Sequence, residues 1–271
     1  MLERIGICFF LFFSLSRYSI VVQAQAHYEL VAEIEKKALF ITNDKLGNVY
    51  TCDGTSLEKY DADGIFLFSY SALSFGKISF VDAYNPFKIM VFSKDFAKLL
   101  FLDNKLSSQQ SAYILSDFNL LPACVCVSYD NGFWVYDESA KQLFRYDAQH
   151  NLQNKSQIIS NLVEKDIDPL FIKESDDGFL LMNDKQNGIL VFDRFGTFLK
   201  LIPIFTDYFQ ITNRQIVYIE DNLLKSIDIQ NINQESMSLP EEGIKQVCIE
   251  TKKMIVLTKD NTVKIYTMTL E

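Results

Sequence analysis

The sequence predicts an all-β fold, a six-bladed β-propeller whose ring is closed by the N-terminal strand completing the last blade. The first observation is a unit of about 40 residues that recurs six times along the chain. The second is composition: 23 Phe and 13 Tyr, beside only 10 Gly and 5 Pro, favour many short strands joined by polar turns. The third is an alternating strand near the N-terminus that belongs to no unit.

Each repeat unit contains an apolar strand that ends in Asp, a short polar turn and a second strand. In the third unit these strands are residues 133–137 and 143–147, with further strands expected at 123–128 and 157–160. Four short strands in a unit of this length are typical of a propeller blade, whereas an α-solenoid needs a helical periodicity that the sequence lacks. Five blades are the alternative, if residues 207–239 are irregular. The first Asp residues of the units are Asp53, Asp95, Asp137, Asp184, Asp221 and Asp260.

The two ends of the repeat array complement each other. The sixth unit has strands near 244–249, 254–258 and 263–269 but lacks a fourth, and residues 27–34 form a strand without a unit. Pairing the N-terminal strand with the last blade leaves no unpaired edge across the seam. We expect one alternating face of this strand to be buried, either Tyr28, Leu30, Ala32 and Ile34 or the opposite face around Val31.

Residues 1–26 have the pattern of a secretory signal peptide. Arg4 precedes the apolar run 5–15, and small-residue cleavage patterns end at Ala24 and Ala26. Arg17 interrupts an apolar stretch that is short for a membrane span of about 20 residues. An uncleaved anchor is the alternative. We therefore expect a single propeller domain at 27–271, a periplasmic or secreted monomer without a transmembrane segment.

Charge and cysteine content narrow the classes of function. The chain has 26 Lys and Arg against 35 Asp and Glu, a net charge of −9, and no basic cluster, so we predict no nucleic-acid partner. Cys52, Cys124, Cys126 and Cys248 follow the leader. Cys124 and Cys126 lie on one face of an apolar strand, which favours buried core thiols; a disulfide that involves Cys248, or a metal pair, is the alternative.

Two turns carry a family resemblance. The sequences YDADG ending at Gly64 and FDRFG ending at Gly196, each after an aromatic strand, resemble six-bladed propellers of the NHL and TolB-like type. Residues 76–104 are similar to exported propeller proteins of Bacteroidota-type bacteria. The resemblance implies the architecture and export, and it specifies no ligand.

The sequence shows no catalytic device. Only His27 and His150 follow the leader, and His150 lies in a polar turn, so we predict no catalytic residue and no cofactor. The repeated Asp residues are expected to cap turns by accepting backbone N–H bonds. The Asp61–Asp63 and Asp176–Asp177 pairs lack the full ligand set of a calcium loop, so we predict no metal site.

Binding residues are sought among those that differ between blades, because the shared ones are explained by the repeat. Residues 82–87 form an insertion stiffened by Pro86, whose aromatic side chains either face a partner or pack between blades. Asn43, Asp44 and Glu250 belong to a wider set near the inner strands. The candidate binding residues are Asp82, Tyr84, Asn85, Phe87, Tyr129, Asp130, Glu174, Asp176, Asn213 and Arg214.

These observations favour an exported, non-enzymatic propeller that acts as a binding or protein-interaction scaffold for an envelope or secreted protein. Two alternatives remain open. One is a metal-dependent lactonase or esterase-like hydrolase that uses channel carboxylates. The other is a glycan-binding module, although Trp134 is the only Trp of the chain and lies on a blade strand.

We predict that the exported protein begins at Gln25 or His27, because both cleavage patterns end the leader there. Intact-mass measurement of the protein isolated from its native envelope checks this expectation. A chain that retains Met1 would contradict it.

Overall fold

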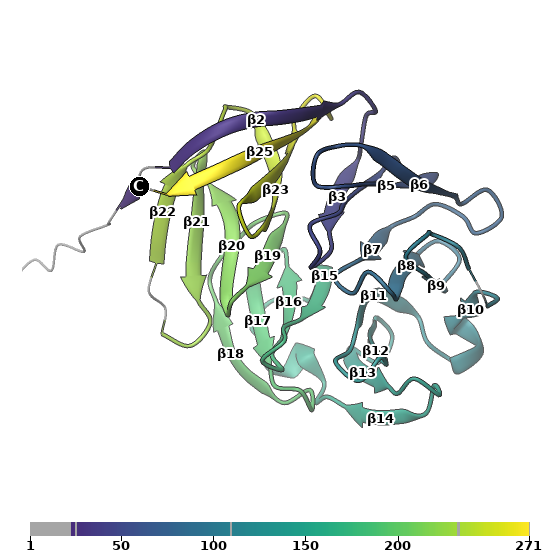
Figure 1. Ribbon diagram of the computed structural model, residues 1–271. Coiled ribbons are helices and arrows are strands. Elements are labelled where there is room, and N and C mark those ends of the chain that lie inside the picture. Colours follow the sequence, from purple (N-terminus) through teal and green to yellow (C-terminus); the bar gives the residue numbers. More distant parts are fainter. Residues whose placement is uncertain (1–22, 25, 109, 232–233, 271) are drawn as a thin grey trace, which may run out of the picture.

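The computed structural model describes residues 23–24, 26–108, 110–231 and 234–270, and it confirms the six-bladed β-propeller. Six sheets stand in a ring and follow one another in chain order (Figure 1). In each blade the first strand lies nearest the centre of the ring and the later strands lie progressively outwards. No helix among the described residues is long and apolar enough to cross a membrane.

The blades contain the following strands, from the centre outwards. The first blade has β3 (Phe40–Asn43), β4 (Val49–Cys52), β5 (Ser56–Tyr60) and β6 (Phe66–Ser71), and the second has β7 (Phe80–Asp82), β8 (Ile89–Ser93), β9 (Lys98–Leu102) and β10 (Tyr113–Ile114). The third blade has β11 (Pro122–Val127), β12 (Phe133–Asp137), β13 (Gln142–Tyr146) and β14 (Leu152–Lys155), and the fourth has β15 (Pro169–Glu174), β16 (Leu180–Asp184), β17 (Gly188–Phe192) and β18 (Phe198–Ile202). The fifth blade has β19 (Phe209–Thr212), β20 (Gln215–Glu220), β21 (Leu223–Asp228) and β22 (Gln234–Ser238), and the sixth has β23 (Ile244–Glu250), β24 (Lys253–Thr258), β25 (Val263–Leu270) and β2 (Ala26–Ile34).

The fifth blade is regular, which decides between five and six blades. Its strands β19 to β22 pair in sequence, and β1 (Gln23–Ala24) adds a parallel strand outside β22. If the leader is cleaved after Ala24, β22 becomes the outer strand of this blade.

Recurrent Asp residues close the turn between the third and fourth strands of four blades. The Oδ1 atoms of Asp61, Asp103, Asp147 and Asp193 each accept the backbone N–H groups two and four residues later, at 2.8–3.0 Å. The residue three positions after each Asp adopts a positive φ, which glycine tolerates best; it is Gly64 and Gly196 in two blades. The turn-cap interpretation is therefore confirmed at these positions.

Each blade is apolar on both faces and packs against both neighbours. Every residue of β8 and β17 is buried. Among the described residues the buried apolar side chains form six clusters, and each cluster lies between two successive blades. The cysteines belong to these layers: Cys52, Cys124, Cys126 and Cys248 are free and buried, as the core interpretation predicts.

The N-terminal strand closes the ring as predicted. β2 pairs antiparallel with β25 over eight residue pairs, from Ala26 opposite Leu270 to Ile34 opposite Val263. Figure 1 shows β2 along the outer edge of the last blade, beside β25. The last blade is thus built from both ends of the described chain.

Three residues of the expected face of β2, Tyr28, Ala32 and Ile34, are half-buried or buried, but they do not share one face, because a bulge at Val31 shifts the register. Before the bulge, Tyr28 lies opposite Met268 and packs toward the fifth blade. After it, Ile34 lies opposite Val263 and packs toward the first blade, where it is 5% exposed. Leu30 is 52% exposed. A bulge exchanges the faces of a strand, so β2 contributes to two interblade clusters instead of one.

The outer strand of the third blade differs from the prediction. It lies at β14 (Leu152–Lys155), directly after the turn capped by Asp147, and not at 157–160. The segment 157–160 instead runs into a short 3-10 helix, Ile159–Asn161. Ile159 is fully buried in the apolar cluster between the third and fourth blades. β14 is polar and mostly exposed, so the search for an apolar strand selected residues 157–160 in its place.

We predict that paired cysteines at Glu29 and Thr267 form a disulfide under oxidation, because these residues face each other across β2 and β25. The bond would close a loop of nearly the whole domain and raise the melting temperature by an amount equivalent to about 5 kcal/mol in the chain-entropy model. Non-reducing electrophoresis and thermal unfolding measure both effects.

The control pair is Glu29→Cys with Met268→Cys, in which the second side chain lies on the opposite face of β25. Equal cross-linking in the two variants, or none in either, would contradict the register.

Candidate functional site: the channel mouth on the hairpin face

The ring has two chemically different faces. The turns between the first and second strands, and between the third and fourth strands, lie on one face, which we call the hairpin face. The turns between the second and third strands and the connections between blades lie on the other, which we call the linker face. All inner strands run from the linker face to the hairpin face.

A cavity of about 570 Å³ opens at the centre of the hairpin face. The second, fourth, fifth and sixth blades line it with the ends of their inner strands. Five of the ten predicted binding residues meet there, together with side chains that the prediction did not include. The predicted residues are Tyr84, Glu174, Asp176, Asn213 and Arg214; the additional polar residues are Lys173, Ser175, Asp177, Gln210, Thr212 and Thr251, with Glu250 from the wider set.

Tyr84 reaches across the mouth from the insertion of the second blade. Its hydroxyl donates to Asp176 Oδ2 in the fourth blade at 2.7 Å, and its carbonyl accepts the Lys45 N–H of the first blade at 3.2 Å. Burial, and then the Asp176 carboxylate, raise the pKa of Tyr84, so the phenol remains a hydrogen-bond donor at neutral pH. The insertion thus connects three blades at the mouth.

The other predicted residues of the insertion have different roles. Asp82 is buried and accepts the N–H groups of Tyr84 and Val127, at 3.4 and 3.3 Å. Asn85 Oδ1 accepts the Phe87 N–H at 3.1 Å. Phe87 is 67% exposed and Tyr84 38% exposed, so neither ring is buried between blades. Asp82 and Asn85 shape the insertion, and Phe87 projects from it.

The charges at the mouth are predominantly negative. Glu174, Asp176, Asp177 and Glu250 line the cavity against Lys173 and Arg214. Arg214 Nε lies 3.3 Å from Asp177 Oδ2. Burial, and then the nearby charge of Asp44, raise the pKa of Glu250. The cavity therefore favours a cationic or hydrogen-bond-donating group.

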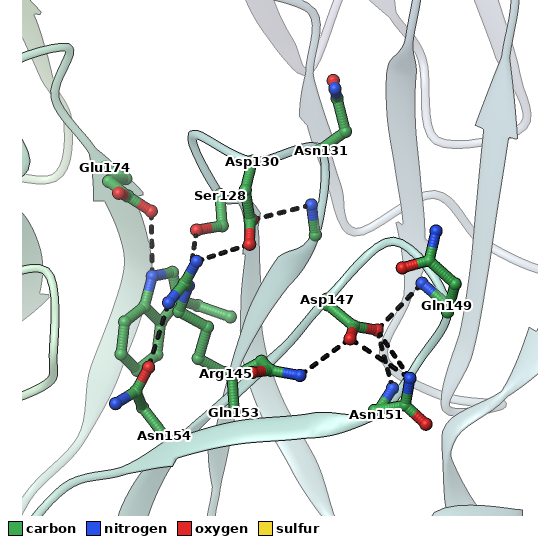
Figure 2. Close-up of polar contacts among 12 residues, drawn as sticks. Ser128, Asp130, Asn131, Arg145, Asp147, Gln149, Asn151, Gln153, Asn154 and Glu174 are labelled. Atoms are coloured by element: carbon green, nitrogen blue, oxygen red, sulfur yellow. Dashed lines mark hydrogen bonds and ion pairs between the residues drawn. The ribbon is translucent and has the colours of Figure 1, made fainter.

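Glu174 is the most constrained carboxylate of the mouth. Trp134 Nε1 donates to Glu174 Oε2 at 2.9 Å from the third blade (Figure 2). Glu174 Oε1 is buried without a hydrogen-bond partner among the described residues. Burial raises the pKa of this carboxyl, against the opposing hydrogen bonds and the charge of Arg145. One oxygen of Glu174 is thus held by a hydrogen bond, and the other is buried without one among the described residues.

Tyr129 and Asp130 belong to a neighbouring site on the third blade and do not line the cavity. Arg145 bonds Asp130 through Nη2 and Ser128 Oγ through Nε, the latter at 3.1 Å (Figure 2). The Tyr129 ring lies 4.5 Å from the Arg145 guanidinium and 5.3 Å from that of Arg194. The Tyr129 ring, 55% exposed, thus lies at the rim between the buried Arg145 and the exposed Arg194.

His150 and the cysteine thiols do not line the mouth. His150 packs 4.2 Å from Tyr113, centroid to centroid, and burial lowers its pKa. Burial raises the pKa of the thiols, to about 12 for Cys124 and about 11 for Cys248. Within the described part of the chain, no group of three or more His, Cys, Asp or Glu side chains is placed to hold a metal ion.

The prediction missed Gln210 and Lys173, both on inner strands. Gln210 joins the fifth blade to the sixth: its Oε1 accepts the Ile249 N–H at 2.6 Å and its Nε2 donates to the Ile249 carbonyl at 2.8 Å. A polar residue inside an otherwise apolar inner strand is the sequence signal that could have identified each of them.

Comparison with known proteins supports the fold only. No protein-family model matches the chain, and no curated protein matches it significantly. Virginiamycin B lyase from Staphylococcus aureus superposes with a TM-score of 0.62 at 12% identity, covering 90% of this chain and 99% of that one. The Cps50 (Swd1) β-propeller domain of Myceliophteria thermophila gives 0.60 at 8%, covering 90% and 100%. BBS1N, in complex with ARL6DN, gives 0.55 at 10%, covering 89% and 95%.

We predict that Glu174→Gln raises the melting temperature at about pH 7.5, and that the difference from wild type shrinks toward about pH 4. The folded-state pKa of Glu174 lies above its unfolded value. Its protonation therefore stabilises the fold at acidic pH, and that contribution is lost as the pH rises through the folded-state pKa. Gln keeps an acceptor for Trp134 and removes the buried charge.

The matched control is Glu164→Gln, at an exposed position without an ion pair among the described residues. We expect it to leave the melting temperature unchanged at both pH values. A Glu174→Gln protein less stable than wild type at neutral pH would show that the neighbouring groups stabilise the carboxylate.

Proposed function

We propose that this protein is an exported, non-enzymatic β-propeller of the NHL and TolB-like type, located in the periplasm or secreted. It acts as a monomer and binds another envelope or secreted protein through the hairpin face. The observation that carries the proposal is the combination of an acidic central cavity with exposed apolar side chains on the surrounding turns.

Three successive blades present apolar or aromatic side chains on their inner hairpins. Leu46 of the first blade is 63% exposed, Phe87 of the second 67% and Tyr129 of the third 55%. Protein interfaces are enriched in aromatic residues beside polar groups that fix orientation. These residues lie on the same face as the polar cavity, and exposed apolar side chains beside such a cavity are more typical of a binding surface than of a solvated one.

The cavity adds charge specificity to this surface. Its carboxylates outnumber its cations, and Arg214 is already paired with Asp177. A basic side chain of a partner would find Asp176, Glu174 and Glu250 within one opening. Complementary charge of this kind speeds association and rejects partners of the wrong sign.

Neither His150 nor a thiol lines the cavity, which favours binding over catalysis by an imidazole or a thiolate. His150 packs among aromatic rings on the third blade, outside the cavity, and the buried thiols have raised pKa values. The folds that superpose on this chain include both an enzyme, virginiamycin B lyase, and a propeller in complex with a protein, BBS1N with ARL6DN. The choice between these uses therefore depends on the site and not on the fold.

We predict that residues 27–271, immobilised, capture a defined protein from envelope extract, and that Phe87→Ser reduces the captured amount severalfold. The change removes the most exposed aromatic side chain of the inner hairpins without opening the core. Quantitative mass spectrometry of the eluates, followed by binding measurements with the purified partner, checks the result.

The matched control is Leu73→Ser on the linker face, where Leu73 is 91% exposed. It should leave capture unchanged. If both variants capture the same proteins as wild type, the hairpin face is not the binding surface. Lactone or ester turnover that a chelator abolishes would instead favour the hydrolase alternative.

A further inference from the structure

A second cavity, of about 300 Å³, opens on the linker face at the other end of the channel. Its walls are mainly apolar. The rings of Phe80 and Phe171 stack at 6.2 Å with an interplanar angle of 15°, and Tyr208 lies 5.8 Å from Phe171. Leu39, at the rim, is 49% exposed. An apolar, aromatic cavity with a few polar groups is the usual form of a small-molecule site.

Lys173 lies at the inner end of this cavity. It lines both the linker-face cavity and the hairpin-face cavity, so its side chain lies in the channel between them. Its charge lowers the pKa of Cys126 and Cys248 against the larger effect of burial, which places the ammonium near the inner strands of the third and sixth blades. Among the described residues it has no ion pair and no hydrogen bond, although it is half-buried.

An ammonium group without an ion pair at the inner end of an apolar cavity is the group with which the carboxylate of a ligand would pair. The other charged residues of the cavity are Lys245 and Asp207, both exposed at the rim. The cavity therefore carries one more positive charge than negative, in a chain whose net charge is −9. At the hairpin-face mouth, in contrast, the negative charges outnumber the positive ones.

We propose that the linker-face cavity binds a small anionic amphiphile, a carboxylate with an aromatic or aliphatic body, whose carboxylate pairs with Lys173. The body would lie against Phe80, Phe171 and Leu170. The volume equals that of about ten water molecules, which sets the size at about ten non-hydrogen atoms. This cavity opens on the face opposite to the one proposed for the protein partner, and Lys173 is the residue that the two linings share.

Three probes with the same phenylpropyl body and different charge test the proposal: 3-phenylpropionate, 3-phenylpropanol and 3-phenylpropylamine. Titration calorimetry and ligand-observed NMR with the purified protein should show binding of the carboxylate, with the alcohol and the amine at least tenfold weaker. Lys173→Met should weaken carboxylate binding roughly tenfold to a hundredfold, the range for a charged hydrogen bond. Lys173→Arg should retain most of it.

Leu39→Glu provides a second variant at a position exposed enough to be tolerated. Its carboxylate at the rim should repel the anion and weaken binding even if Lys173→Met does not fold. Lys259→Met removes a charge from the linker face outside this cavity and should have no effect. Equal affinity for the alcohol, preference for the amine, or unchanged binding in folded Lys173→Met would overturn the proposal. Loss of partner capture in Phe87→Ser would leave it unaffected.

Discussion

The structure depends on blades that are apolar on both faces. β8 and β17 bury every residue, and an apolar cluster lies on each side of every blade, so each blade is covered by two neighbours. Only a closed ring meets this requirement. β2 completes the closure, and its bulge allows Tyr28 to pack toward the fifth blade and Ile34 toward the first. At roughly 25 cal/mol per Å² of apolar area, a strand that serves two clusters contributes a substantial part of the stability of a domain.

Closing the ring brings a second constraint to its centre. Each inner strand has one unpaired edge, whose backbone groups need partners when they are buried. Side chains of adjacent blades supply them: Gln246 bonds the Ile41 N–H and carbonyl at 3.1 and 2.6 Å, Gln210 does the same for Ile249, and Asp82 accepts from Val127. An amide carries both a donor and an acceptor, so one Gln satisfies both groups of a backbone residue. Part of the polar lining of the channel is therefore explained by the hydrogen bonds that the inner strands need, independently of any ligand.

The repeat, the turn caps and the ring closure were predictable because each leaves a local signal. Asp147 caps its turn through the N–H groups of Gln149 and Asn151, all within five residues of sequence (Figure 2). The outer strand β14 and the bulge in β2 were not predictable, since one is polar and the other reverses an alternation without changing composition. The site was predicted in part. Tyr84 and Asp176 meet although 92 residues separate them. Tyr129 and Asp130 instead form a separate site at the rim, where Asp130 pairs with Arg145. The ring geometry decides which of these residues meet, and the local sequence carries no signal of it.

The different chemistry of the two mouths follows from strand direction. Every inner strand begins at the linker face and ends at the hairpin face, and several of them begin with an aromatic residue and end with a polar one. β7 runs from Phe80 to Asp82, and β15 carries Phe171 before Lys173 and Glu174. Along a single inner strand the side chains change from apolar to polar within a few residues. Because the inner strands all run in the same direction, the channel that they line is apolar at one end and acidic at the other. Lys173 lies where the gradient changes, and among the described residues it is the cation that lines both cavities.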